Sequence, residues 1–313
     1  MSLQEAQHAS YQQTIVRPVE THGIGLHTAV KSHVRLLPAP PDTGIVFRRT
    51  DLDGFQIEAH IRNVARVSYA TSLMKQGVLL STTEHILAAI YACGIDNIYI
   101  EIDALELPIL DGSAQPYMEM LDHAGLRRQK RHRTYLKAIK PMEVSDGDRR
   151  IGIYPSSNFR VTCFVDYAHP KVGRQEVELE VNSATFRREL AIARTFGFVS
   201  DFDDLRAMGL IRGGSLENAI VLTADDVMNG PVRFPDEFVR HKALDLIGDL
   251  ALIGKPLQAH VVAHKAGHSL HTQFVTRLLA NSSVLVETQA QQSAQPAKSH
   301  LSPRFSRPAH ATD

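Results

Sequence analysis

Two aspartates and a histidine recur at intervals of four residues in the stretch "VRHKALDLIGDL", residues 239–250. If this stretch is a helix, His241, Asp245 and Asp249 share one face, because residues four apart lie above one another. The apolar residues fall on the other face, which we expect to pack against a core. A polar helix face alone is typical of a surface wetted by solvent. A chemical role for these side chains therefore depends on partners from elsewhere in the chain.

A glutamate and a histidine are adjacent near the start of a second predicted helix, in "STTEH". Ser81 is a good N-cap, so Glu84 three residues later could complete a capping box. Alternatively, Glu84 could be a general base beside a metal-bound His85, because adjacent side chains diverge by about 100° around a helix. The segment alone leaves both interpretations open.

His85, His241 and Asp245 would together offer two imidazoles and one carboxylate. This set suits a catalytic zinc site, which keeps a fourth position for water. The spacing of four lets His241 and Asp245 reach one ion from one helix. Glu84 would then accept a proton from the water.

His268 follows a glycine in "HKAGHSL", and such a histidine is commonly a surface loop residue. Its functional interpretation is a general acid that protonates a leaving group. Asp249, one turn beyond Asp245, could hold that imidazole in its protonated form.

Two further segments carry polar side chains with an ordinary and a functional interpretation. Thr195 in "ARTFGF" could bond to the backbone, as buried hydroxyls usually do, or donate to a developing oxyanion. His27 lies in "GIGLHT", where a G-x-G by itself indicates only a tight turn.

The composition excludes several classes of protein. The 313 residues include 34 Lys and Arg and 34 Asp and Glu, so the net charge is zero and nothing favours nucleic acid or an anionic membrane. Cys93 and Cys163 are too few for a disulfide framework or a thiolate zinc site. The N-terminus lacks the apolar core of a secretory signal, and no apolar run has the length of a membrane span. These features predict a cytoplasmic protein.

The elements that would position these residues alternate between strands and helices. Residues 84–102 and 240–263 share one plan, a histidine near a helix start, a glycine and then a strand. Two similar halves would place two helix N-terminal regions, each with a histidine, where they could face each other. The basic stretch "LRRQKRHR", residues 126–133, is interpreted as a helix end plus linker and as the domain boundary. Helices are predicted at 81–94, 183–196 and 239–250, and strands at 30–40, 44–52, 55–61, 97–104, 134–145, 150–155, 160–168, 217–222 and 257–264.

With these motifs in place, the chain resembles the UDP-3-O-acyl-N-acetylglucosamine deacetylase family, the zinc amidases that commit the pathway to lipid A. The resemblance extends over residues 11–280. It is carried by ordered segments that include "GIGLHT", "GIVFRRTDL", "STTEHILAAIYACGIDNIYIEID", "LPILDGSAQPY", "HPKVGRQ", "ARTFGF", "GGSLENAIVL", "DEFVRHKALDLIGDLALIG" and "HKAGHSLH".

The resemblance implies roles for particular residues. The implied catalytic residues are Glu84 as base, His268 as acid, Asp249 as its orienting partner and Thr195 beside the oxyanion. The implied zinc ligands are His85, His241 and Asp245, and iron(II) could occupy the same ligands. The implied substrate contacts are Lys242, Phe196 near the acyl chain, Arg149 and Tyr167 near UDP, and His27.

The resemblance also implies an α+β fold of two topologically similar domains, each a sheet packed on helices, with the helices facing at the interface. Domain I would cover residues 11–130 and domain II residues 131–280, with an insert at about residues 196–220 that forms a passage for the acyl chain. Residues 1–10 and 281–313 would be tails, the second one disordered because Gln, Ser, Ala and Pro dominate it.

The implied partner is a small-molecule UDP-sugar that carries a fatty acyl chain, handled by a monomer in the cytoplasm of a Gram-negative-type bacterium. Two positions depart from the family. Ala29 stands where the family has glycine, and a turn with positive φ there would strain it. Arg149 stands where the family often has lysine.

Other interpretations stay open at this point. The chain could be a zinc hydrolase of another nucleotide sugar, or a binding module without catalysis. A binding module would have a damaged ligand set, whereas each matched position holds a chemically competent residue. A fusion with a dehydratase domain, known in some bacteria, is disfavoured by the length of the chain.

Overall fold

The computed structural model of this protein describes residues 10–65 and 69–289. Two large sheets form within this part of the chain, and the first of them lies in its N-terminal half. Every second residue of "IYIEI" is buried, so one face of the sheet packs inward. The strands, in order across the sheet, are β2 (Val19–Ile24), β3 (Lys31–Pro38), β8 (Ile98–Ile102), β4 (Ile45–Arg49) and β5 (Phe55–Glu58), with η1 (Thr50–Leu52), η2 (Ile61–Asn63), β6 (Leu73–Lys75) and β7 (Val78–Leu80) beside them.

The second sheet is built around one central strand, β17 (Leu257–His264), whose residues alternate between buried and half-buried. β17 pairs in antiparallel fashion with β12 (Arg149–Pro155) and in parallel with β13 (Arg160–Tyr167) and β10 (Thr134–Ala138). The outer strands are β11 (Met142–Asp146), β14 (Gly173–Glu180) and β18 (Leu285–Gln289).

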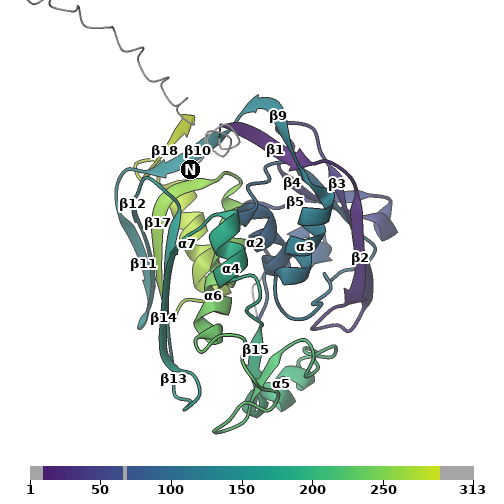
Figure 1. Cartoon of the computed structure of the whole chain (residues 1–313), viewed down its shortest axis with the longest axis vertical. Coiled ribbons are helices and arrows are strands. Elements are labelled where there is room, and N and C mark those ends of the chain that lie inside the picture. Colours follow the sequence, from purple (N-terminus) through teal and green to yellow (C-terminus); the bar gives the residue numbers. More distant parts are fainter. Residues whose placement is uncertain (1–9, 66–68, 290–313) are drawn as a thin grey trace, which may run out of the picture.

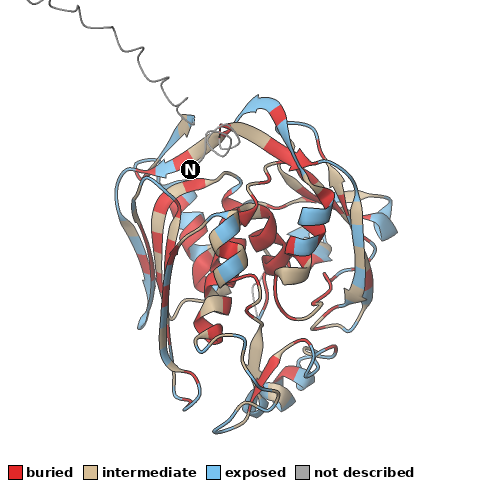
Figure 2. Ribbon diagram, in the orientation of Figure 1, coloured by how far each residue is buried: buried red, intermediate tan, exposed pale blue. Residues whose placement is uncertain are grey.

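Helices fill the space between the two sheets (Figure 1). Burial is concentrated there, on α2 and α6 and on the inner faces of the sheets (Figure 2). Within the described residues, no helix combines the length and the hydropathy that crossing a membrane requires. The helices are α2 (Glu84–Ala92), α3 (Gln115–Ala124), α4 (Ser183–Glu189), α6 (Glu237–Leu250), which continues into η4 (Ala251–Ile253), and α7 (His268–Ala280).

The two halves repeat one arrangement. In the first, α2 is followed by β8, which lies parallel to β4, and in the second, α6 is followed by β17, which lies parallel to β13. α2 packs against α6, so the helices of the two halves face one another. The predicted α+β class with facing helices is therefore confirmed, whereas the exact boundary near residue 130 stays a prediction.

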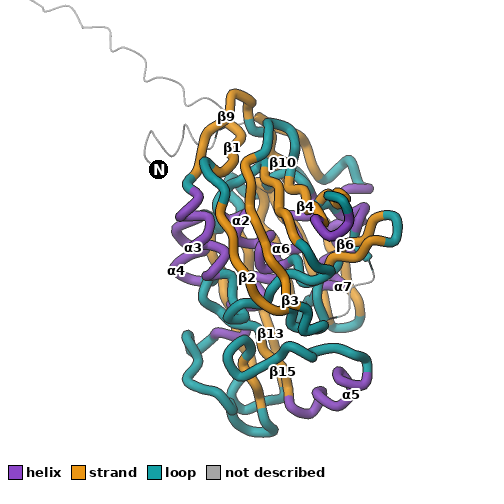
Figure 3. Tube along the Cα trace, turned by 90° about the vertical axis from the view of Figure 1, so that its right-hand side faces the viewer, coloured by secondary structure: helices purple, strands orange, loops and turns teal. Residues whose placement is uncertain are grey.

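A small lobe (residues 195–233) projects from the second half beyond the sheets (Figures 1 and 3). Its two strands are short and parallel, and they leave most of the segment in turns and loops. The elements of the lobe are β15 (Phe196–Phe198), η3 (Val199–Asp201), α5 (Phe202–Ala207) and β16 (Ile220–Leu222).

Three expectations about local structure are wrong. The basic stretch forms a strand, β9 (Leu126–His132), rather than a helix end plus linker, because it pairs with β1 (Tyr11–Ile15). The helix predicted to reach residue 196 ends at Glu189, because Phe196 pairs with β16 instead. Residues 281–289 are not a tail, since β18 adds to the edge of β10. The remainder of the predicted tail, residues 290–313, and most of residues 1–10 lie outside the described residues.

Candidate metal centre

The centre lies where α2 and α6 touch. Gly248 makes this approach possible, because a Cβ atom there would lie 2.1 Å from the carbonyl oxygen of Glu84, far inside any real contact. The face of α6 that carries His241, Asp245 and Asp249 is therefore turned toward α2 and is buried, not wetted by solvent.

His85 from α2 meets His241 and Asp245 from α6 in a buried cluster. The Nε2 atoms of His241 and His85 lie 3.3 Å and 3.8 Å from Asp245 Oδ1, and one potential ligand atom from each residue lies within 4.8 Å of the others. Among the described residues, Asp245 Oδ1 has no hydrogen-bond partner. A buried carboxylate oxygen that faces two imidazole nitrogens without a hydrogen bond fits a place for a cation.

The protonation states of the cluster also suit a metal. Burial lowers the pKa of His85 to about 3 and lowers the pKa of His241, so both imidazoles are neutral near pH 7. Burial alone would raise the pKa of Asp245, but the adjacent His241 and Lys242 outweigh it and hold that pKa well below its usual range. His241 Nδ1 lies 3.0 Å from the carbonyl oxygen of Ala193 and can donate to it, which leaves Nε2 as the free lone pair. Neutral imidazoles and an ionised carboxylate are the forms that bind metal ions.

Glu84 lies beside this cluster and is not a capping-box residue. The helix begins after Thr83, no side chain caps it, and the Ser81 hydroxyl instead pairs with Ser72. Glu84 Oε2 accepts the backbone N–H of Thr71 at 3.0 Å. Burial raises the pKa of Glu84 to about 7, which is suited to taking up a proton near neutral pH.

His268 is the first residue of α7, and it faces Asp249 across 2.7 Å through Nδ1. Burial lowers the pKa of His268, but the charge and hydrogen bond of Asp249 outweigh this and raise the pKa to about 9. The pKa of Asp249 falls to about 2, because the nearby imidazoles outweigh the effect of its own burial. This histidine is therefore protonated at pH 7, in contrast to the two in the cluster.

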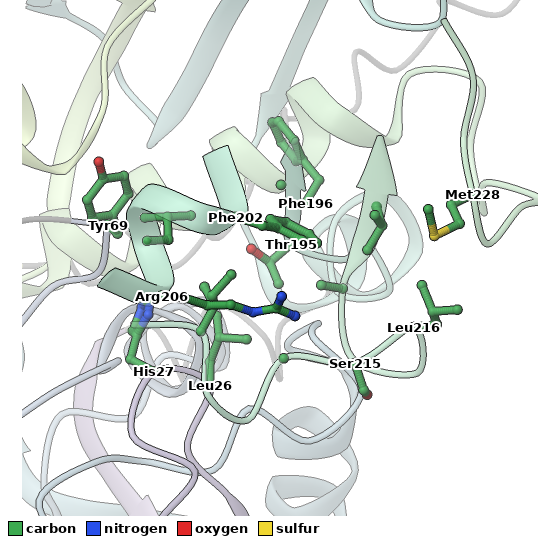
Figure 4. A pocket seen from close by; sticks show the side chains of 16 residues that line it. Leu26, His27, Tyr69, Thr195, Phe196, Phe202, Arg206, Ser215, Leu216 and Met228 are labelled. Carbon is green, nitrogen blue, oxygen red and sulfur yellow. The ribbon is translucent and has the colours of Figure 1, made fainter. Parts of the chain in front are cut away.

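A cavity of about 290 Å³ opens into the lobe. Thr195, Phe196 and His27 line it together with apolar residues of the lobe (Figure 4). The Phe196 ring lies 6.5 Å from the ring of His241, so the cavity adjoins the metal cluster. Thr195 is fixed through its backbone to Gly112 and Ile220, which holds its side chain at the wall of the cavity.

The remaining expected substrate contacts divide into two near the centre and one outside it. Lys242 donates to Asp245 Oδ2 at 2.9 Å, and its Nζ lies 5.5 Å from the centroid of the Phe196 ring. Tyr167 packs edge-on against Phe196 at 5.7 Å. Arg149 lies at the exposed start of β12 and pairs with Asp146, and within the described residues it lines neither the cavity nor the cluster.

Ala29, which departs from the family, lies in the turn that carries His27, and this turn has the positive φ that would strain alanine. Ala29 has φ of 58°, in the left-handed region where alanine is strained. The turn is held by Glu106, a fully buried residue whose carboxylate accepts the backbone N–H groups of His27 and Thr28 at 2.8 Å. His27 therefore reaches the cavity wall, and hydrogen bonds from a buried carboxylate offset the strain.

Sequence reasoning missed two residues of the centre. His271, one turn after His268 on α7, also contacts Asp249 Oδ2 through Nδ1, at 2.8 Å. The spacing of three in "HSLH" could have revealed it, since such residues share a helix face. Thr71 forms hydrogen bonds with both Glu84 and Asp249, but no sequence pattern around it indicates these contacts. A separate group that could hold a metal, Glu20, His22 and His33, lies on β2 and β3, largely exposed.

A buried pair of imidazoles with a carboxylate, beside one carboxylate with a raised pKa and one imidazole with a raised pKa, is the arrangement that a metal-dependent hydrolase requires. The family model of UDP-3-O-acyl N-acetylglycosamine deacetylase matches residues 12–280. The chain is 54% identical to the UDP-3-O-acyl-N-acetylglucosamine deacetylase of Solibacter usitatus over 88% of this chain and 93% of that protein. It is 46% identical to the corresponding enzyme of Syntrophotalea carbinolica over 87% and 88%, and 43% identical to that of Myxococcus xanthus over 87% of each chain. The chain belongs to this family of deacetylases, which are hydrolases of amide bonds.

Proposed function

We propose that this protein hydrolyses the N-acetyl amide of UDP-3-O-acyl-N-acetylglucosamine and releases acetate, a step of lipid A biosynthesis, with zinc as its metal. Family membership and the names of the relatives support the substrate. The observation that carries the chemistry is the buried meeting of His85, His241 and Asp245 beside Glu84.

His85, His241 and Asp245 would hold the ion. When bound, zinc would supply a Lewis acid that lowers the pKa of water and polarises the amide carbonyl. Lys242, which pairs with the second oxygen of Asp245, keeps that carboxylate oriented with Oδ1 toward the two imidazoles. Iron(II) suits the same donors, so metal analysis of the purified protein identifies the ion.

Glu84 would take a proton from the attacking water. Its pKa of about 7 allows the ionised form to be present at neutral pH while the carboxylate remains basic enough to accept the proton. Burial keeps bulk water away from this carboxylate, and the N–H of Thr71 fixes one of its oxygens.

His268 would deliver a proton to the departing amine, because an amine is too basic to leave as an anion. Asp249 keeps His268 protonated and, through Nδ1, fixes the plane of the ring. The Nε2 atom is the remaining donor, and it lies 3.9 Å from Asp245 Oδ2, on the side of the cluster. Base and acid are thus two separate residues, and both contact Thr71.

Thr195 and the cavity would bind the substrate. The Thr195 hydroxyl at the cavity wall is a donor for the oxyanion that develops on the amide carbonyl. The apolar lining that includes Phe196, Phe202 and Leu205 suits a fatty acyl chain. As the resemblance implies, Tyr167, which packs on Phe196, and Arg149 would contact the UDP, and His27, which lines the cavity, would contact the substrate there.

The test is acetate release from UDP-3-O-acyl-N-acetylglucosamine by the purified chain, measured before and after chelation. We expect turnover that a chelator abolishes and added zinc restores. Parallel reactions with other N-acetylated UDP-sugars that lack the acyl chain distinguish this activity from a broader nucleotide-sugar hydrolase. Binding of the substrate without acetate release from fully metallated protein would contradict the proposal and favour a binding module.

A further inference from the structure

Thr71 lies between the proposed base and the partner of the proposed acid. Its backbone N–H donates to Glu84 Oε2 at 3.0 Å, and its hydroxyl donates to Asp249 Oδ1 at 2.5 Å. The residue is fully buried. One threonine therefore contacts both carboxylates, which belong to helices from different halves of the fold.

The hydroxyl of Thr71 completes the hydrogen bonds of Asp249. The other two donors, His268 and His271, both approach Oδ2, at 2.7 Å and 2.8 Å. Within the described residues, Thr71 is the one side chain that donates to Oδ1. Without that hydroxyl, Oδ1 would be a buried acceptor with no donor, and the carboxylate would lose the contact that fixes its rotation.

The same hydroxyl also faces the acid directly. Thr71 Oγ1 lies 3.0 Å from His268 Nδ1. Because the hydroxyl proton is given to Asp249, a lone pair of Oγ1 is free to accept from the protonated ring. The Nδ1–H of His268 thus meets two acceptors, Asp249 Oδ2 and Thr71 Oγ1, which together set the direction of the ring and hence of Nε2.

Thr71 is itself anchored independently of its hydroxyl. Its carbonyl oxygen accepts the hydroxyl of Thr83 at 3.1 Å and the backbone N–H of Thr83 at 3.2 Å. Thr83 immediately precedes Glu84, so backbone bonds tie Thr71 to the start of α2 on both sides. A change confined to the side chain leaves this anchor, and the bond to Glu84, in place.

We propose that Thr71 is a positioning residue that aligns the Asp249–His268 pair with Glu84 through its hydroxyl. This inference rests on the function proposed above, because it concerns the alignment of the base and the acid in that reaction. Thr71 touches neither substrate nor metal in this role. Its effect is on how well the proton donor is directed, so it should appear in kcat and not in KM.

The test compares Thr71→Val, which keeps the shape and removes the hydroxyl, with Thr71→Ser, which keeps the hydroxyl. Because a hydrogen bond to a charged group is lost, we expect kcat to fall about 10–100-fold in Thr71→Val with KM within about twofold. Thr71→Ser should recover most of that loss. Thr272→Val is the matched control, since the buried hydroxyl of Thr272 has no hydrogen-bond partner among the described residues.

A double-mutant cycle with Asp249→Asn asks whether Thr71 acts through Asp249. If it does, Thr71→Val costs much less in the Asp249→Asn background than in the unsubstituted chain, because the two residues work as one unit. An equal fold-loss in both backgrounds, or turnover by Thr71→Val as fast as by the unsubstituted chain, would overturn the proposal.

Two measurements keep the outcome interpretable. Thermal unfolding and metal content establish that each variant is folded and loaded, and if Thr71→Val fails either check, Thr71→Ala replaces it in the comparison with Thr71→Ser. If the unsubstituted chain releases no acetate, the proposed function fails. If the unsubstituted chain is active and loss of the hydroxyl has no effect on kcat, the positioning role alone fails.

Discussion

The helix pair α2–α6 carries the candidate metal cluster and the lobe lines the adjoining cavity, and the two regions are built in different ways. The pair is buried almost throughout, and Gly248 brings the two backbones together. The lobe has strands of three residues and a helix of six. Its cavity is lined by half-buried phenyl rings, and four apolar side chains of the lobe are exposed: Val199, Met208, Leu216 and Met228.

This difference suits the role that we propose for each region. Groups that bind a metal or move a proton need placement to a fraction of an ångström, which rigid, buried helices provide. An acyl chain has no direction-dependent bonds, so a loosely built apolar wall can bind it. We therefore expect the same kind of substitution to affect turnover in the helix pair and substrate affinity in the lobe.

The largest effect should come from Glu84→Gln in the helix pair. The amide keeps the size of the side chain but cannot accept the proton, so kcat should fall on the order of 10²–10⁴-fold. Acetate release gives the rate, and elemental analysis should find the metal retained, because His85, His241 and Asp245 are intact. Glu119→Gln on the exposed face of α3 is the control. A Glu84→Gln enzyme with nearly normal turnover would rule out Glu84 as the base.

Asp249→Asn should change the pH dependence as well as the rate. In the proposed reaction His268 would act only while protonated, so we expect activity to be present below its pKa of about 9 and to be lost as the pH rises through that value. Without the charge of Asp249, the pKa falls toward the ordinary value of about 6.5, and the alkaline limb of the kcat/KM profile moves to lower pH. The acid limb, set by Glu84 with its pKa of about 7, should move little by comparison.

The control for this profile is Asp122→Asn, which removes an exposed carboxylate on α3 that pairs with Arg187. Its profile should match that of the unsubstituted chain. An unchanged alkaline limb in Asp249→Asn would show that another group is the acid, and it would remove the reason for placing His268 in that role.

A glycine-to-alanine substitution in each region makes the comparison direct. In Gly248→Ala the new methyl meets the Glu84 carbonyl oxygen. Overpacking costs about 1–3 kcal/mol or more, against up to about 1 kcal/mol gained from helix propensity. We expect a lower free energy of unfolding and a loss of turnover, because α2 and α6 move apart. In Gly197→Ala the new methyl would lie 3.5 Å from Phe202, an ordinary contact, so stability should barely change. Urea unfolding compares the two, and equal stability losses would contradict the difference in rigidity.

The sequence allowed the helix pair to be predicted better than the lobe, for a physical reason. His241, Asp245 and Asp249 lie on one helix, and helical periodicity is a local property that spacing reveals. The partnership with His85 is not local: the ligand chemistry of the three side chains suggested it as one possibility, and the resemblance to a family implied it. Thr71 meets Asp249 across 178 residues of sequence, and no pattern near Thr71 indicates that contact.

Where a local sequence pattern predicted the wrong secondary structure, a contact with a distant part of the chain explains the structure that forms. Ser81 has the chemistry of an N-cap, yet it pairs with Ser72, and the helix begins after Thr83. The basic residues of β9 would suit a surface linker, but the free edge of β1 pairs with them. The helix predicted to reach residue 196 ends at Glu189, and Phe196 lies instead in β15, which pairs in parallel with β16. Propensity is a weak guide wherever a distant strand supplies hydrogen bonds.

The smallest effect should come from Phe202→Ala in the lobe, and it should appear in KM. Phe202 lines the cavity and is half-buried. Because full burial of such a ring is worth about 1.5–3 kcal/mol, its loss should raise KM for a long-chain substrate on the order of tenfold and leave kcat unchanged. A short-chain analogue should show little change, since it does not reach the ring.

The control is Val199→Ala, because Val199 is an exposed residue of the lobe that is not among the described cavity-lining residues. A fall in kcat with an unchanged KM would mean that the lobe helps to align the reacting groups, and the division of labour between the two regions would then be wrong.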